Sequence, residues 1–137
     1  MSPEPFILDT SAIFTLIEDE AGAERVDTLL RSQEILLPWI VLLEVAYISR
    51  QELGEAEADH RLAHLKRLPL TILWGADEPI LLTGARLKAT FHLSLADAII
   101  AAYAIRLDAT LVHKDPEYDA LAGQVKLESL PYKASAL

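Results

Sequence analysis

Three acidic residues stand alone in long apolar stretches of the sequence. Each of Asp9, Glu44 and Asp97 is the only charged residue in a run of 12 to 14 residues. A carboxylate in such a run is often partly buried, and an unpaired buried charge costs free energy. Each acid therefore needs a cation, a hydrogen-bonding cap or a raised pKa.

A divalent cation would meet this need for all three acids at once. If their carboxylates meet in space, mutual repulsion raises the cost of burying them further. Mg²⁺ and Mn²⁺ prefer oxygen ligands, and a few carboxylates with waters and a substrate phosphate commonly bind them. A fourth acid, Asp115, follows the apolar run at 110–113 and is expected at the same edge of a sheet as Asp9.

Helix capping is an alternative interpretation of the three aspartates. Asp9 precedes Thr-Ser, and Asp, Thr and Ser are all good N-cap residues. Asp97 follows Ser94 by three positions, a weak form of the capping box, and Asp115 precedes a proline, as an N-cap often does. Glu44 lies in the middle of a predicted helix and cannot cap it. The alternative to a binding role is that Glu44 lies on a narrow solvent-exposed stripe of this helix.

Short apolar runs alternate with helical periodicity along the chain. The predicted strands span residues 6–8, 35–37, 70–74, 110–113 and 125–130. The predicted helices span residues 12–18, 21–31, 39–51, 55–67, 79–90, 95–107 and 116–122. This alternation predicts an α/β fold, a three-layer α/β/α sandwich with a mainly parallel central sheet. Sites in such folds form beyond the carboxyl ends of the strands, where Asp9 and Asp115 fall.

Composition sets limits on the function. The 137 residues predict a single domain spanning residues 1–137. With 21 acidic residues against 12 Lys and Arg, the net charge of −9 excludes a nonspecific RNA coat, since phosphate binding relies on Lys and Arg. The absence of cysteine excludes a disulfide framework, a thiolate zinc site and a cysteine nucleophile. The longest uncharged stretches fall short of the roughly 20 residues of a membrane span, and no signal-like N-terminus is present, so we expect a cytoplasmic protein.

The segments around the four acids share a pattern with a known family. They read Asp9-Thr-Ser-Ala, Leu-Leu-Glu44-Val-Ala, Ser-Leu-Ala-Asp97-Ala-Ile and Val-His-Lys-Asp115-Pro-Glu-Tyr. Together they resemble the PIN-domain ribonucleases, and most of all the VapC-type toxins of type II toxin–antitoxin systems. The resemblance spans the chain from the first predicted strand to the short helix after the fourth.

The resemblance implies an activity and its residues. It implies an Mg²⁺- or Mn²⁺-dependent endoribonuclease that hydrolyses RNA phosphodiester bonds. Asp9, Glu44, Asp97 and Asp115 would be both its catalytic residues and its metal ligands, with Ser11 orienting the first acid.

The sequence departs from the family pattern around the fourth acid. His113 stands where Thr or Ser is usual, and Glu117-Tyr118 stands where Asp-Phe is frequent. His113 is expected to fill the end of its strand rather than to contact substrate.

The resemblance also implies partners, namely an RNA substrate, a cognate antitoxin protein and a second copy of the chain in a homodimer. The predicted helix at 40–48, with Trp39, Tyr47 and Trp74, would supply an apolar groove for the antitoxin, although core packing also explains these residues.

Several other functions are compatible with the same fold class. One is a PIN-like interaction module without activity, and another is an RNA-processing nuclease that is not a toxin. A receiver domain requires adjacent acids after the first strand, and an aspartate-nucleophile phosphatase requires Asp-x-Asp. The Asp9-Thr10-Ser11 segment has neither pattern.

Overall fold

The computed structural model describes residues 4–133, which form five strands and seven helical segments. The strands are β1 Pro5–Leu8, β2 Glu34–Pro38, β3 Thr71–Leu73, β4 Thr110–His113 and β5 Lys126–Ser129. The α-helices are α1 Thr10–Ile17, α2 Ala23–Ser32, α3 Trp39–Leu53, α4 Glu55–Arg67, α5 Glu78–Thr90 and α6 Leu95–Arg106. A 3₁₀ helix, η1, spans Pro116–Leu121.

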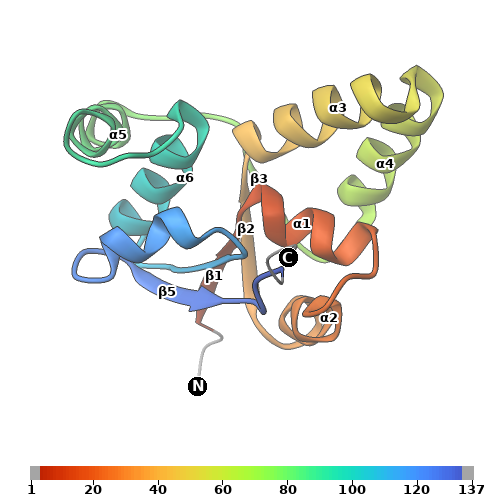
Figure 1. Cartoon of the computed structure of the whole chain (residues 1–137), viewed down its shortest axis with the longest axis horizontal. Helices are drawn as coiled ribbons and strands as arrows, with labels where there is room; N and C mark the ends of the chain where they lie inside the picture. The colour runs from red at the N-terminus through yellow and green to blue at the C-terminus, as the bar shows by residue number, and fades with distance from the viewer. Residues whose placement is uncertain (1–3, 134–137) are drawn as a thin grey trace.

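The strands form one parallel sheet with the order β3-β2-β1-β4-β5. Helices α5 and α6 lie on one side of this sheet, and α1 to α4 lie on the other (Figure 1). The predicted α/β/α sandwich is therefore confirmed, and every strand pair is parallel. No helix within residues 4–133 combines the length and the apolar character that crossing a membrane requires.

The strand order reverses between β1 and β4, which lie side by side in the middle of the sheet. Leu8 at the end of β1 pairs with Val112 in β4. The backbone N–H of Asp9 continues this ladder by donating to the carbonyl oxygen of Val112, at 3.1 Å. Open parallel sheets bind ligands beyond the carboxyl ends of the strands at such a reversal, and Asp9 lies at this point.

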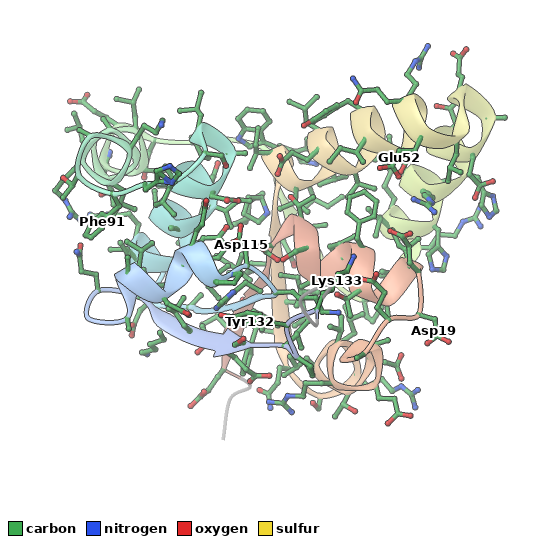
Figure 2. The ribbon with its side chains drawn as sticks, viewed as in Figure 1. Asp19, Glu52, Phe91, Asp115, Tyr132 and Lys133 are labelled. Atoms are coloured by element: carbon green, nitrogen blue, oxygen red, sulfur yellow. The ribbon has the colours of Figure 1, made fainter. Side chains whose placement is uncertain are left out.

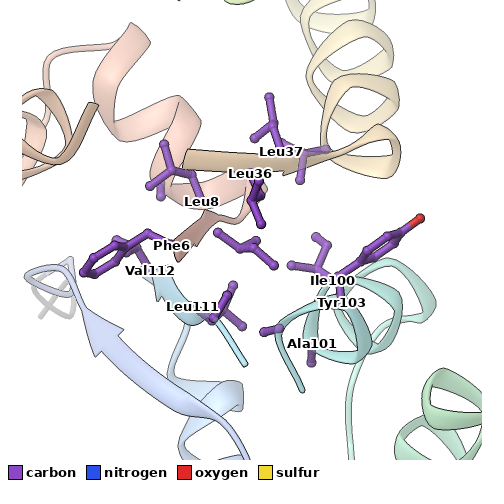
Figure 3. Close-up of a cluster of buried hydrophobic side chains, with 14 of the residues drawn as sticks. Phe6, Leu8, Leu36, Leu37, Ile100, Ala101, Tyr103, Leu111 and Val112 are labelled. Carbon is purple, nitrogen blue, oxygen red and sulfur yellow. The ribbon is translucent and has the colours of Figure 1, made fainter. Parts of the chain in front are cut away.

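The core lies on both faces of the central strands. Figure 3 shows Leu8, Leu36 and Leu111 from the sheet together with Ile100 and Tyr103 from α6. Helix α6 is rich in alanines, and all four of its alanines from position 98 onward are buried. Their small side chains allow the helix to pack closely without voids. This packing fixes the helix whose first turn carries Asp97.

Most predicted elements differ from the observed ones by one or two residues at an end, and the last predicted helix also differs in type. The predicted strand at 70–74 shortens to β3, an edge strand in which Thr71 is exposed and Ile72 and Leu73 are half buried. The second helix begins at Ala23 rather than at residue 21, because Gly22 adopts a left-handed conformation with φ of 106°. A side chain there would also crowd Leu130, with the two Cβ atoms at 3.2 Å. The predicted helix at 116–122 is the tighter 3₁₀ turn η1.

Candidate metal centre

Asp9 is held by hydrogen bonds at the junction of β1 and α1. Its side chain caps α1 by accepting a hydrogen bond from the backbone N–H of Ala12, at 2.8 Å. The Ser11 hydroxyl donates to Asp9 Oδ1 at 2.7 Å and accepts from the backbone N–H of Lys114 at 2.9 Å. Ser11 therefore links the first acid to the end of β4, next to Asp115.

Asp97 lies in the first turn of α6, with its backbone and its carboxylate each bonded to a hydroxyl. Its backbone N–H donates to Ser94 Oγ at 3.1 Å, which caps the helix. Its carboxylate Oδ1 accepts from the Tyr118 hydroxyl at 3.0 Å. The cap of α6 therefore fixes the backbone of Asp97, and Tyr118 in η1 fixes its carboxylate.

Asp115 caps η1 and lies close to Asp97. Its Oδ1 accepts from the backbone N–H of Glu117 at 2.9 Å. Asp97, Asp115 and Glu117 each present one carboxylate oxygen, and these three oxygens lie within 4.8 Å of one another. Two predicted ligands and one acid that was not predicted therefore form the closest group.

Glu44 joins the centre from α3, although it and Asp9 lie outside that closest group. Its carboxylate accepts a hydrogen bond of 2.6 Å from the hydroxyl of Thr10, the first residue of α1. Repulsion from Glu44 is one of the smaller effects that raise the pKa of Asp97. Repulsion from Asp97 and Asp115 likewise helps to raise the pKa of Asp9. The structure thus brings all four predicted acids to one edge of the sheet.

Burial and mutual repulsion disfavour negative charge at this centre. Asp9 is 2% exposed, and burial raises its pKa to about 7 against the opposing effect of its bonds to Ser11 and Ala12. Burial also raises the pKa of Asp97 to about 6. None of the four predicted acids forms an ion pair with a Lys or Arg within residues 4–133.

The donor set suits a hard divalent cation. All the groups are carboxylate oxygens, which Mg²⁺ and Mn²⁺ prefer. A cation among them would compensate the burial and the repulsion that together raise the two pKa values. The residues present therefore fit the predicted metal, with Glu117 as a further oxygen donor.

Comparison with known proteins decides the family. The sequence of residues 6–124 matches the PIN domain family. The chain belongs to the PIN domain family. The family predicted from the acid motifs is thereby confirmed. No curated protein sequence matches the chain.

Solved structures share the fold of this PIN domain at low sequence identity. VapBC2 from Rickettsia felis, bound to a DNA fragment from its promoter, superposes with a TM-score of 0.77 at 19% identity, over 93% of this chain and 99% of that one. VapBC-1 from nontypeable Haemophilus influenzae gives 0.72 at 20% identity, over 91% and 97%. Mycobacterium tuberculosis VapC20, described as a sarcin-ricin loop cleaving toxin, gives 0.69 at 17% identity, over 88% and 97%.

An open cleft of about 470 Å³ lies beside the acids of the PIN domain. Asp115 lines it together with Ser11, Glu52, Tyr132 and Lys133, and Figure 2 labels four of these five side chains. Through this cleft, solvent and ligands can reach Asp115 at the candidate metal centre.

A second, apolar pocket of about 370 Å³ lies between α3, α4 and the segment after β3. Trp39, Leu43, Leu62 and Trp74 are among its lining residues, and Trp74 is 65% exposed. Two of the three aromatic residues predicted for an apolar groove therefore line it. Tyr47 is also on the surface but does not line this pocket.

Glu117, Tyr118 and Thr10, which donates to Glu44, were not predicted as site residues. Glu117 completes the closest group of carboxylates, and Tyr118 donates to Asp97. The one sequence feature that could have indicated Glu117 and Tyr118 is their departure from the Asp-Phe that is frequent in the family at these positions. His113 fills the end of β4 as expected, fully buried, with its Nδ1 accepting from the backbone N–H of Asp115 at 3.2 Å.

Proposed function

We propose that this PIN domain is a metal-dependent endoribonuclease that hydrolyses RNA phosphodiester bonds and is the toxin of a toxin–antitoxin pair. The observation that carries the proposal is the buried Asp9 carboxylate, unpaired with any Lys or Arg of residues 4–133 and surrounded by further acids at the strand-order reversal. The likeness to VapC20, described as a toxin that cleaves the sarcin-ricin loop, supports RNA as the substrate class.

The carboxylates of the centre would hold Mg²⁺ or Mn²⁺. Asp9 and Asp97 would be the principal ligands, and Glu44 and Asp115 would complete the site or help to hold a second ion. When bound, the cation supplies a water of lowered pKa and neutralises charge on the scissile phosphate. Ser11 orients Asp9, and Thr10 orients Glu44, through the hydrogen bonds described above.

The cation also reconciles an acidic protein with an anionic substrate. A bound cation would offset part of the negative charge of the acidic centre and would itself attract an RNA phosphate, so a net charge of −9 does not prevent a phosphate from binding there. The cleft beside Asp115 offers the strand a path to the centre, and Lys133 lies in its lining. Lys133 Nζ lies 3.1 Å from Glu20 Oε2, and the Lys133 side chain is still three-quarters exposed.

Cleavage of labelled RNA by purified protein tests the proposal. We expect the wild type with Mg²⁺ or Mn²⁺ to cut RNA, and EDTA to stop the reaction. Asp97→Asn should abolish cleavage, because the amide lacks the charge that binds the cation. Asp59→Asn, an exposed acid on α4, is the matched control and should cut at the wild-type rate. Undiminished cleavage by Asp97→Asn would sink the proposal.

The same variants test the toxin role in cells. Expression of the wild type should arrest growth, whereas Asp97→Asn should not. Co-expression of the product of the adjacent gene should relieve the arrest if that product is the antitoxin. Cleavage in vitro by a chain that is harmless at high expression would instead indicate an RNA-processing nuclease.

We also propose that the chain works in the cytoplasm and binds an antitoxin protein and a second copy of itself. The likeness to chains of two VapBC structures supports the antitoxin partner. The apolar pocket lined by Trp39 and Trp74 is the proposed antitoxin surface.

A further inference from the structure

Tyr118 places a hydroxyl inside the acid cluster. Its side chain is fully buried, and its hydroxyl donates to Asp97 Oδ1 at 3.0 Å. Two other tyrosine hydroxyls in residues 4–133 donate elsewhere, Tyr103 to the carbonyl oxygen of Gly75 and Tyr132 to Asp119. Tyr118 is thus the one hydrogen-bonded tyrosine of this part of the chain whose hydroxyl contacts a proposed metal ligand.

The position of the Tyr118 ring is fixed by the turn that carries it. The ring lies 4.9 Å from the ring of His113, centroid to centroid, at an interplanar angle of 60°. The backbone N–H of Tyr118 donates to the carbonyl oxygen of Asp115 at 3.2 Å, and the Asp115 side chain caps the same turn. One short segment therefore carries a proposed ligand and the hydroxyl that contacts another.

The Tyr118 hydroxyl acts as a neutral donor among several negative groups. Burial and the nearby carboxylates of Asp9 and Asp97 raise the pKa of Tyr118 well above its ordinary value, so the hydroxyl keeps its proton. Its hydrogen bond opposes the effect of burial on the pKa of Asp97. The hydrogen bond from Tyr118 therefore holds the Asp97 carboxylate without adding charge to the centre.

We propose that Tyr118 is a positioning residue that fixes the Asp97 carboxylate for divalent-cation binding by donating to its Oδ1. This inference rests on the metal site of the proposed function. A carboxylate has about four lone-pair sites, so one hydrogen bond to Oδ1 leaves capacity for a cation. Because the ligand is already oriented, binding a cation does not have to restrict its side chain anew.

Titration of metal-free full-length protein with Mn²⁺ in a calorimeter tests the role of Tyr118. Tyr118→Phe keeps the buried ring and its contact with His113 but removes the hydroxyl. We expect the dissociation constant for Mn²⁺ to rise by about tenfold or more, as is typical when a partner of a metal ligand is removed.

Tyr103→Phe is the matched control, because it removes the hydroxyl of another buried tyrosine, which donates to the carbonyl oxygen of Gly75 at 2.6 Å, outside the centre. It should leave the Mn²⁺ dissociation constant unchanged, even if it lowers the melting temperature as much as Tyr118→Phe does. Wild-type affinity in Tyr118→Phe would overturn the positioning role alone. Failure of the wild type to bind Mn²⁺ would overturn the proposed metal site as well.

Discussion

Asp9 and Asp77 make the same local bond in very different surroundings. Each caps the helix that follows it by accepting a hydrogen bond from the backbone N–H three residues later, at 2.8 Å for Asp9 and 3.0 Å for Asp77. Asp9 is 2% exposed, and repulsion from Asp97 is among the effects that raise its pKa. Asp77 is exposed on the surface.

Topology explains why only one of these caps belongs to a candidate site. Asp9 follows the central strand β1, at the strand-order reversal beside β4. Asp77 lies four residues beyond β3, the strand at the edge of the sheet. A helix cap therefore becomes part of a binding site only where the fold also buries it and places other acids nearby.

Activity should show the largest difference between these two caps. Asn caps helices about as well as Asp, so Asp9→Asn and Asp77→Asn should both keep their helix ends. If the proposed function holds, we expect single-turnover RNA cleavage to fall by at least about a hundredfold in Asp9→Asn, because a proposed metal ligand loses its charge. Asp77→Asn should cleave at the wild-type rate. Equal rates for the two variants would contradict the distinction drawn here.

Stability should separate the caps through its dependence on pH. The folded-state pKa of Asp9, about 7, lies above the ordinary pKa of 3.8 for an aspartate. Ionisation is therefore costly in the folded protein, so the free energy of unfolding falls as the pH rises from about 4 to about 7. The shift corresponds to a loss of up to about 4 kcal/mol, and the contribution of Asp9 to stability is most favourable below its unfolded-state pKa. Asp97 shifts in the same direction.

Urea unfolding in EDTA at pH 5 and pH 8 measures this loss. Asp9→Asn should remove most of the decrease and be more stable than the wild type at pH 8. Asp77→Asn should retain the full decrease. If the stability difference between pH 5 and pH 8 were the same in both variants, Asp9 would not be the source of the decrease.

Local sequence chemistry was sufficient to predict the caps and most of the sheet. The expected bonds at Asp9, Asp97 and Asp115 are all present. Capping and membership of an acid cluster are therefore compatible, since the bonds that cap the helices also hold the acids in place. The strand at 110–113 has the predicted bounds because its apolar residues are buried in the sheet.

Contacts between distant elements could not be predicted in this way. The bond from Tyr118 to Asp97 spans 21 positions, and the bond from Thr10 to Glu44 spans 34. Such contacts depend on which helix faces meet above the sheet, and neither periodicity nor spacing specifies that. The predicted strand at 70–74 was too long for a similar reason, since its pairing depends on the single neighbour β2.

A smaller effect should distinguish the hydroxyls that support the acids. The partly buried Ser11 donates to Asp9 and accepts from the backbone N–H of Lys114, whereas the exposed Ser94 accepts only from the backbone of Asp97. Ser11→Ala should therefore cost about 1–3 kcal/mol of unfolding free energy, because it leaves a donor without a partner. Ser94→Ala should cost about 1 kcal/mol, the usual value of an N-cap.

The pH dependence distinguishes support of the acid from simple packing. The Ser11 bond lowers the pKa of Asp9, so Ser11→Ala should raise that pKa further. In Ser11→Ala, the pH range over which the metal-free protein loses stability should then extend to higher pH. Ser94→Ala should lower the free energy of unfolding by a similar amount at every pH, with little change in that range. Urea unfolding at intervals from pH 5 to pH 9 measures both effects. An identical pH dependence in the two variants would mean that Ser11 stabilises the chain junction without controlling the charge of Asp9.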